Sequence, residues 1–507
     1  MQHADSAQLA AVVGALGAVA TLLARGRLTL LAGLLLLALA ELALVLSIGA
    51  GGLDQLLSPA GAFAGVLGAA VMIAAASLLV KRPQLAPLAV LVAAPFRPPI
   101  EFDTGSAVLV KIARDGALGR LLPLYFVLVA AVMALAWRAL RGETVRALPR
   151  SITLPAAAFF AFACMSLLWA ENLEGAANLL VFFTLPFALL LTVVARSPFP
   201  PGLVRKLGIT GVSLAALFAA VGLWQAATHK LFFFAPNLQV SNANTDYFRV
   251  TSLFGDPSLY GRHLVLGIAV LLAVLAAGRV KPWLGIGLLA FLWAGLLFSY
   301  SQSSMVALVV ITLAVAMASG DRRTRRAVVA VGVVAVLAGG GFLAAKLVTG
   351  SSLNQLTSDR EQRVTDTLRV VRDHPLVGVG IAGQPRASRL AAHSERPTAS
   401  FVSHTTPLTV AAELGVIGLL LYAWLLVGGA RVIYEVRKRD EGLGLALGAA
   451  FVALFVHALF YSGFLEDPLT WVVMGVAAGW LAHADAHATA SERARARHAS
   501  RRPAAAT

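Results

Sequence analysis

Long apolar runs separated by short polar links fill most of this 507-residue chain. A helix that crosses a bilayer needs about 20 apolar residues, with a range of roughly 17–25. The pattern therefore predicts an all-α fold, a polytopic transmembrane helix bundle of about 12–15 spans. The candidate spans are 7–24, 28–48, 61–80, 84–96, 121–137, 151–169, 175–195, 207–228, 258–278, 282–299, 304–319, 327–346, 407–430, 443–462 and 468–484. The run 84–96 is short and ends at Pro95, which predicts a re-entrant segment or a tilted half-helix.

Basic residues gather in alternate links between these spans. Cytoplasmic loops of membrane proteins carry an excess of Lys and Arg, so these links and the C-terminus are predicted to be cytoplasmic. The basic links are 25–27, 81–82, 138–150, 196–206, 279–281, 322–326 and 431–439. The links between them are then extracytoplasmic, and two of those, 229–257 and 347–406, are long and polar.

The two long loops divide the chain into four parts. N-terminal transmembrane helices occupy 1–228, a core with both loops occupies 229–430, C-terminal helices occupy 431–484, and a basic tail occupies 485–507. Irregular polar backbone is tolerated at a bilayer only where water, protein or a charged ligand meets it. We therefore expect the function to lie on the extracytoplasmic side, in the core.

Composition agrees with a membrane protein. The chain is 59% hydrophobic and its mean hydropathy is +0.81, well above the values of soluble domains. The formal charge of +16 is spread over short interhelical links, so it indicates topology, and no nucleic-acid partner is expected. Cys164 is the single cysteine, which rules out an internal disulfide.

The loop 347–406 contains a predicted amphipathic helix. Ser358-Asp-Arg-Glu361 is a capping box that starts it, and Pro375 ends it at Asp373-His374. An apolar stripe comprises Val364, Leu368 and Val371. A polar face comprises Arg360, Arg363 and Thr367. The helix either points its arginines at a membrane-embedded site or lies at the interface with solvated arginines.

The loop 229–257 ends with an arginine and a helix start. Arg249 precedes Phe254-Gly-Asp-Pro257, in which Asp256 or Ser258 is the expected helix cap. Guanidinium groups bind phosphate in a bidentate manner and keep their charge, so Arg249 and Arg363 are candidates to hold a lipid-linked diphosphate. The alternative is that Arg249 extends to the lipid headgroups.

His404 lies at the end of the outer loop and is a candidate general base. Other outer histidines are His229, His374 and His393, whereas His263 and His457 lie within predicted spans and are expected to bond neighbouring helices. Glu413 lies two turns into the following span, where an intramembrane carboxylate usually has a partner. We expect it to pair with an arginine or to orient His404.

A metal site is the weaker alternative. Glu101 and Asp103 form an acidic pair on the predicted loop 97–120, a spacing that also arises by chance. No His/Cys cluster has zinc spacing and no phosphate-binding loop motif is present. We therefore expect no cofactor, and an outward-facing site requires a donor that is already activated.

Several segments together resemble the bacterial O-antigen ligase and O-antigen polymerase superfamily. His404-Thr405 followed by Gly415-Val-Ile-Gly418 resembles its histidine-to-glycine signature. His374-Pro-Leu-Val-Gly-Val-Gly380 resembles the turn after its outer-loop helix. Arg249 with Phe254-Gly-Asp-Pro-Ser258, and Ser299-Tyr-Ser-Gln-Ser-Ser304, resemble two further segments. The likeness covers about residues 245–430.

This chain departs from the family pattern at several positions. Thr405 stands where Asn, Ser or Gln is usual, Gln302 replaces a common Arg, and Asp256 and Ser258 replace two asparagines. The choice between ligase and polymerase therefore stays open.

The resemblance implies a metal-independent, inverting glycosyltransferase in the bacterial inner (plasma) membrane. The donor would be a glycan on undecaprenyl diphosphate, and the acceptor a lipid or glycan hydroxyl. His404 would take the hydroxyl proton, while Arg249, Arg363 and Arg360 would hold the diphosphate, supported by Glu413 and Asp256.

Two other functions remain open. One is a lipid-linked oligosaccharide flippase or transporter, which usually has charges within its spans and repeated halves; here the spans look nearly charge-free and no repeat is visible. The other is a metal-dependent polyprenyl-sugar glycosyltransferase that uses Glu101 and Asp103.

Overall fold

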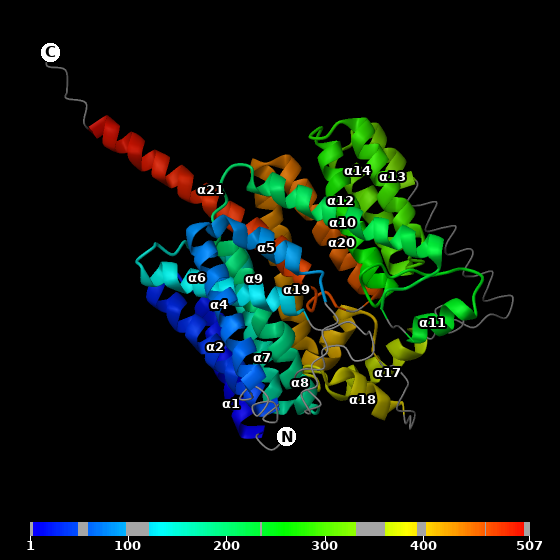
Figure 1. Cartoon of the computed structure of the whole chain (residues 1–507), viewed down its shortest axis with the longest axis horizontal. Coiled ribbons are helices and arrows are strands. Elements are labelled where there is room, and N and C mark those ends of the chain that lie inside the picture. The colour runs from blue at the N-terminus through cyan, green and yellow to red at the C-terminus, as the bar shows by residue number, and fades with distance from the viewer. Residues whose placement is uncertain are drawn as a thin grey trace, which may run out of the picture.

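The computed structural model describes residues 4–48, 59–97, 121–233, 236–330, 360–392, 402–461 and 463–500. These residues form helices joined by turns, with no strand among them (Figure 1). The helical elements are α1 (Ala4–Leu23), α2 (Arg27–Ile48), α4 (Pro59–Lys81), η2 (Pro83–Leu85), α5 (Ala86–Ala93), α6 (Leu122–Leu140), α7 (Arg150–Met165), η3 (Ser166–Trp169), α8 (Leu173–Leu179), η4 (Leu180–Thr184), α9 (Leu185–Arg196), α10 (Leu203–Thr228), α11 (Pro236–Ala243), α12 (Pro257–Ala276), α13 (Pro282–Leu297), α14 (Gln302–Ser319), α17 (Arg360–Asp373), α18 (Gln384–Ala391), α19 (Thr406–Arg439), α20 (Glu441–Phe460) and α21 (Pro468–Ser500).

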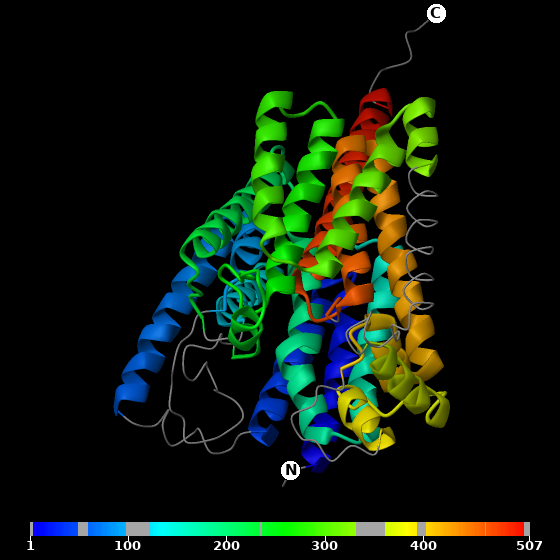
Figure 2. The ribbon, with the colours of Figure 1, turned by 90° about the vertical axis from the view of Figure 1, so that its right-hand side faces the viewer.

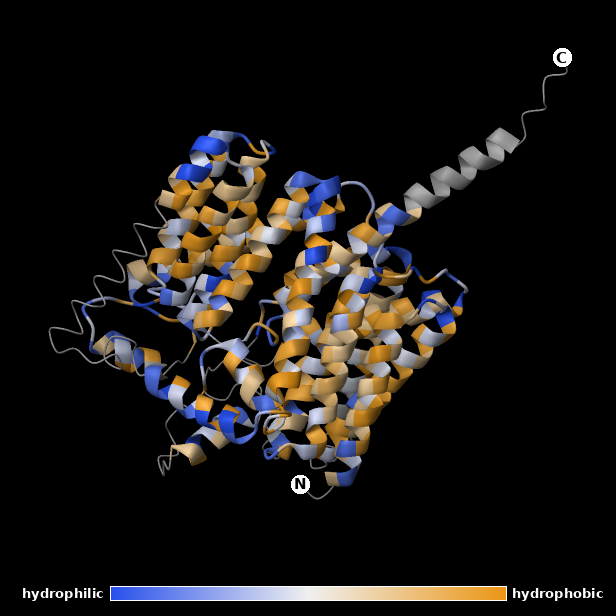
Figure 3. Cartoon of the chain, turned by 180° about the vertical axis from the view of Figure 1, so that it is seen from behind, coloured by the Kyte–Doolittle hydropathy of each residue, from blue (hydrophilic) through white to orange (hydrophobic). Residues whose placement is uncertain are grey.

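The all-α polytopic bundle is confirmed. Within the described residues, ten helices are long and apolar enough to span a membrane, or eleven if one bent pair counts as a span. The predicted span 282–299 forms the 16-residue helix α13, and 468–484 lies within α21. Most of 327–346 lies outside the described residues. Figure 3 shows hydrophobic residues along the helices and hydrophilic residues gathered at their ends.

The predicted half-helix exists. The segments Gly65–Lys81 and Pro83–Ala93 meet at an angle of 109°, so the chain turns back into the bundle after α4 instead of completing a straight span. α5 packs against α6 and α10. The half-helix ends just before Arg97, and it therefore carries a cation into the interior.

Buried side chains form two large clusters that meet at α20. The first cluster joins α1, α7, α9, α19 and α21, and the second joins α10, α12, α14 and α20. α20 packs against α12, α14 and α19. Figures 1 and 2 place α17 and α18 at the end of the bundle where the chain begins. Residues at this end of α12, α19 and α20 therefore lie at the junction of the two clusters.

α17 begins at Arg360 and ends at Asp373, where the sequence predicted its end. Its buried face is different from the predicted apolar stripe. Asp366, Thr367 and Val370 are buried, whereas Leu368 is 51% exposed. Polar packing explains the difference, because Gln384 Nε2 of α18 donates to Thr367 Oγ1 at 3.1 Å and to Ser388 Oγ at 2.8 Å.

The turn after α17 is inserted into a break in α19. Gly415 has φ 64° and ψ −165°, which interrupts the helix. The amides of Val379 and Gly380 donate to the carbonyls of Ala412 and Glu413, and the amide of Val416 donates to the Pro375 carbonyl. The turn thus satisfies backbone groups that the break leaves without helical partners. The segments 374–380 and 415–418, which both carried the sequence resemblance, therefore pack together as one unit.

Replacing Gly415 by alanine is expected to destabilise the protein and to reduce its activity. Its backbone conformation is nearly exclusive to glycine, at a cost of about 1–3 kcal/mol for other residues, and a Cβ atom there would lie 2.2 Å from the Leu376 carbonyl oxygen. The measurement is the unfolding temperature in detergent. Gly211→Ala in α10 is the control, because nothing lies within 4 Å of a Cβ there. Equal unfolding temperatures for the two variants would contradict the prediction.

Candidate active site

His404 and Arg363 are in direct contact. Arg363 Nη1 of α17 lies within hydrogen-bond distance of His404 Nε2 at the entry to α19. A guanidinium group can only donate, so Nε2 accepts and the ring proton lies on Nδ1. The fold brings together two predicted site residues that are 41 positions apart in sequence.

A network of hydroxyl groups holds His404 in an unusual conformation. Its φ is 57°, in the left-handed region that residues other than glycine rarely adopt. Ser403 Oγ lies 2.5 Å from Thr409 Oγ1 and donates to the Thr405 carbonyl at 3.1 Å. Backbone strain of this kind is common at functional sites, and here it turns the imidazole toward α17.

Tyr461 lies beside His404 and links it to the loop that contains Asp256. The two ring centroids are 6.3 Å apart. Asp256 caps α12 as predicted, accepting from the amides of Ser258 at 2.6 Å and Leu259 at 3.1 Å. Burial, followed by the Asp256 carboxylate, raises the pKa of Tyr461. The phenol therefore stays protonated and can donate to Asp256.

A buried ion pair that the sequence reasoning missed lies behind Tyr461. Arg262 Nη1 donates to Asp467 Oδ2 at 2.6 Å, and the two side chains are 4% and 5% exposed. Arg262 Nε donates to His457 Nδ1 at 3.2 Å, and the guanidinium carbon lies 5.7 Å from the Tyr461 ring centroid. The signal was present in the sequence, because Arg262 lies inside the predicted span 258–278. The premise that the spans are nearly charge-free was wrong at this position.

Arg97, which follows the half-helix, adds a second cation to this region. Burial lowers the pKa of Arg97, and the Asp467 carboxylate opposes that effect. Tyr461 and Arg262 also influence it electrostatically. Arg97 was not among the predicted site residues, since its position becomes meaningful only when α5 folds back into the bundle.

The remaining predicted residues lie elsewhere or outside the described part. Arg249 donates from Nε to the Ser299 carbonyl at 3.3 Å and from Nη2 to the Tyr300 carbonyl at 3.5 Å. Its convergence with the Arg363–His404 pair stays a prediction. Arg360 opens α17, but its side chain lies outside the described residues, as do Glu101, Asp103 and His393.

Glu413 has a different partner from those that the sequence suggested. Its Oε1 accepts from the amide of Gln384 at 3.4 Å, at the start of α18. The break in α19 accounts for this, because it turns the end of the first helical segment toward the inserted turn and α18. Glu413 therefore helps to fasten the outer loop, and its pairing with an arginine or with His404 stays a prediction.

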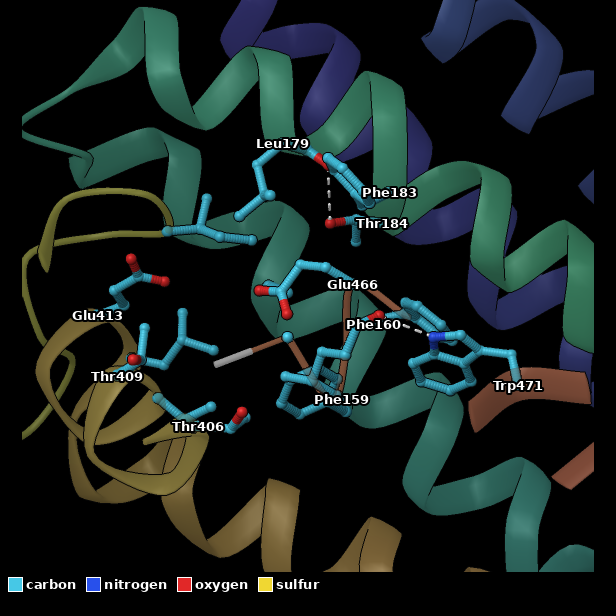
Figure 4. A pocket seen from close by; sticks show the side chains of 16 residues that line it. Phe159, Phe160, Leu179, Phe183, Thr184, Thr406, Thr409, Glu413, Glu466 and Trp471 are labelled. Atoms are coloured by element: carbon cyan, nitrogen blue, oxygen red, sulfur yellow. Dashed lines mark hydrogen bonds between the residues drawn. The ribbon is translucent and has the colours of Figure 1, made fainter. Parts of the chain in front are cut away.

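Glu413 and Glu466 enter one small cavity (Figure 4). The cavity has a volume of about 50 Å³ and is also lined by Thr406 and Thr409. Glu466 Oε2 is buried and has no hydrogen-bond partner among the described residues. Burial raises the pKa of Glu466, an effect to which the Asp467 charge adds and which Arg262 opposes. Glu466 is thus poised to be neutral in the folded protein at pH values where a free glutamate is charged.

Glu466→Gln is expected to raise stability at pH values above the usual glutamate pKa. The folded pKa of Glu466 is raised above its unfolded value, so its favourable contribution is full below the usual glutamate pKa and is lost as pH rises through the folded pKa. The variant removes that loss. The measurement is the unfolding temperature from about pH 5 to 8, with Glu435→Gln on the exposed surface as control. An unchanged pH profile would contradict the prediction.

The comparison with protein families matches the segment that contains Arg363 and His404. Residues 287–423 match the family model described as O-antigen ligase. This chain carries an O-antigen ligase domain. The resemblance seen in the sequence is thereby confirmed. The comparison with curated proteins found no match.

The O-antigen ligase domain contains Arg363, His404 and the break at Gly415. Its family consists of membrane enzymes of the glycosyltransferase type, either ligases or polymerases. Arg249, Asp256, Arg262 and Tyr461 lie outside the matched segment. Arg249 nevertheless donates to the carbonyls of Ser299 and Tyr300 within it, and Tyr461 lies beside His404. The surroundings of His404 thus come from the ligase domain together with Tyr461 at the end of α20.

Proposed function

We propose that this protein transfers a glycan from undecaprenyl diphosphate to a hydroxyl acceptor on the extracytoplasmic side of the bacterial inner membrane, with inversion and without a metal. The acceptor is either a lipid-core sugar or another lipid-linked glycan. The observation that carries the proposal is the contact between Arg363 and His404 inside the matched ligase domain.

His404 is proposed as the general base. In the described state its Nε2 lone pair faces Arg363. A bound diphosphate would attract the Arg363 donors, which would leave Nε2 available to the acceptor hydroxyl. The hydroxyl oxygen then attacks the anomeric carbon while its proton passes to Nε2. The bond from that carbon to the diphosphate oxygen breaks, and the leaving diphosphate keeps the electron pair.

The arginines are proposed to stabilise the leaving group. Negative charge grows on the bridging oxygen as the bond breaks, and fixed cations favour that change. Arg363 contacts His404 directly. Arg249 and Arg360 are proposed to complete the diphosphate site. Tyr461 and Asp256 are proposed to form its wall on the α12 side.

A reconstituted transfer assay tests this proposal. Purified full-length protein receives a polyprenyl-diphosphate glycan and candidate acceptors, with and without chelator. Release of polyprenyl diphosphate that survives chelation supports the proposal, and product length separates ligase from polymerase. Loss of turnover on chelation would favour the metal-dependent alternative with Glu101 and Asp103. Movement of the lipid across the bilayer without any transfer would favour the flippase.

Arg363→Gln is expected to lower turnover by about 10²–10³, the usual effect of removing one charge-stabilising donor. Arg363→Lys is expected to recover part of that loss, because lysine restores the positive charge but cannot bind a phosphate in the bidentate manner of a guanidinium group. Arg372→Gln, a charge change near the end of the same helix, is the control. Equal losses in the Arg363→Gln and Arg372→Gln variants would show a general effect of loop charge instead.

A further inference from the structure

A second polar cavity lies at the opposite end of the bundle from His404. Its volume is about 300 Å³, and its polar lining comes mainly from Arg138, Glu143, Arg146 and Arg196. The span Leu173–Arg196 connects the two ends. At its start Asn172 donates to the Ala382 carbonyl beside the outer loop, and its 24 residues extend about 36 Å at 1.5 Å per residue. The cavity is therefore separate from the proposed transfer site.

Arg196 is buried at this cavity without a countercharge. Its side chain is 8% exposed. Nη1 donates to the Arg146 carbonyl at 2.8 Å, and Nη2 donates to the carbonyls of Thr21 at 2.9 Å and Ala24 at 3.0 Å. Its Nε has no hydrogen-bond partner among the described residues. Carbonyl groups satisfy donors but do not neutralise a buried charge.

The other arginines leave the cavity positive. Arg138 pairs with Glu143 at 2.6 Å, which balances one charge. Arg146 Nη1 lies 2.7 Å from His483 Nδ1, and a histidine nitrogen that accepts from arginine is neutral. Within the described residues, neither Arg146 nor Arg196 has a carboxylate partner. Two uncompensated positive charges therefore face a space much larger than one water, which occupies about 30 Å³.

The residues around the cavity indicate which kind of anionic ligand it would bind. The apolar part of the lining includes Leu30, Leu135 and Val145. Next to it, Leu28 is 77% exposed and Leu140 is 64% exposed, as expected for side chains that contact acyl chains. By the positive-inside rule this end of the bundle is cytoplasmic, and anionic phospholipids attract basic groups in that leaflet. An apolar outer rim with a cationic interior matches a lipid whose headgroup carries a phosphodiester.

We propose that this cavity binds a phosphate group, supplied by the headgroup of an anionic phospholipid. Arg146 and Arg196 contact the phosphate, while Glu143 limits the affinity by holding Arg138. A bound lipid would tie the α1–α2 link, the α6–α7 loop and the end of α9 together, because these three segments already meet at Arg196.

Lipid binding to the purified full-length protein tests this proposal. Native mass spectrometry compares phosphatidylglycerol with phosphatidylcholine of the same acyl chains. We expect Arg146→Gln to weaken the phosphatidylglycerol complex about fivefold, the usual effect of one arginine at an anionic surface, and to leave phosphatidylcholine unchanged. Glu143→Gln is expected to strengthen it. Arg146 is exposed, and its carbonyl, which Arg196 uses, remains in the variant.

Arg141→Gln is the matched control. Arg141 lies on the same loop and is placed over the Trp137 ring at 4.9 Å, but it does not line the cavity. It should bind phosphatidylglycerol like the wild type. Inorganic phosphate forms a second arm of the experiment. Protection from unfolding by phosphate that requires Arg146, without preference for phosphatidylglycerol, would support the phosphate site and assign it to a soluble ligand. Equal binding of both lipids with no effect of phosphate, or equal losses in Arg141→Gln and Arg146→Gln, would overturn the proposal.

Discussion

His404→Gln is expected to lower the rate of glycan transfer by about 10²–10⁴, the usual contribution of a general base. Glutamine preserves the approximate size of the side chain, and its amide can accept from Arg363, but it cannot take up a proton at neutral pH. The donor should therefore still bind. The measurement is the single-turnover rate together with the affinity for the polyprenyl-diphosphate glycan.

His374→Gln is the matched control for that variant. His374 lies on the same outer segment, is 48% exposed, and has its Nε2 3.7 Å from Glu171 Oε1. Its replacement should leave the rate within a few-fold of the wild type. A His404→Gln enzyme that keeps most of its rate would show that the proton leaves by another path. A variant that loses donor binding and rate together would indicate a structural role for His404 instead.

Arg262→Met is expected to destabilise the protein by about 3–5 kcal/mol, because it leaves the Asp467 carboxylate buried without its partner. The pair is almost completely buried, at 4% and 5% exposure. Arg262 also contacts His457 and Tyr461, so turnover should fall as the wall beside His404 loosens. The measurement is the free energy of unfolding in mild detergent, accompanied by the transfer rate.

A double variant and a second ion pair make this test specific. Arg262→Met combined with Asp467→Leu is expected to recover much of the stability, since neither charge is then buried alone. The control is Arg279→Met, which breaks the Arg279–Asp440 pair of the same 2.6 Å length but at 49% and 29% exposure. Its loss should be at most about 1 kcal/mol. Similar losses from both single variants would contradict the argument from burial.

Local pattern predicted some features of the site. The short apolar run that ends at Pro95 predicted the half-helix. The length of an apolar run and the helix-breaking effect of a proline are both local properties of the sequence. The Asp256 cap and the end of α17 before Pro375 were predictable for the same reason. Arg363 and His404 were both singled out as candidates, although their direct contact depends on the fold of the outer loop.

Other features could not be predicted from local pattern. Leu368 of the apolar stripe predicted on α17 does not face inward, because the buried face includes Thr367, which finds a hydrogen-bond partner on α18. Glu413 bonds the start of α18 because the chain breaks at Gly415, and the break itself is stabilised by the turn after α17. Each of these arrangements depends on a second segment whose position local periodicity does not encode.

The sequence by itself determined that this protein is an all-α membrane bundle of the O-antigen ligase type, since span length, caps and short motifs are properties of neighbouring residues. Only the tertiary structure decided which charges meet. Arg262 and Asp467 are 205 positions apart in the chain, and Arg196 reaches carbonyls more than 170 positions away. Such contacts arise from the packing of distant helices, which the hydrophobic pattern permits but does not specify.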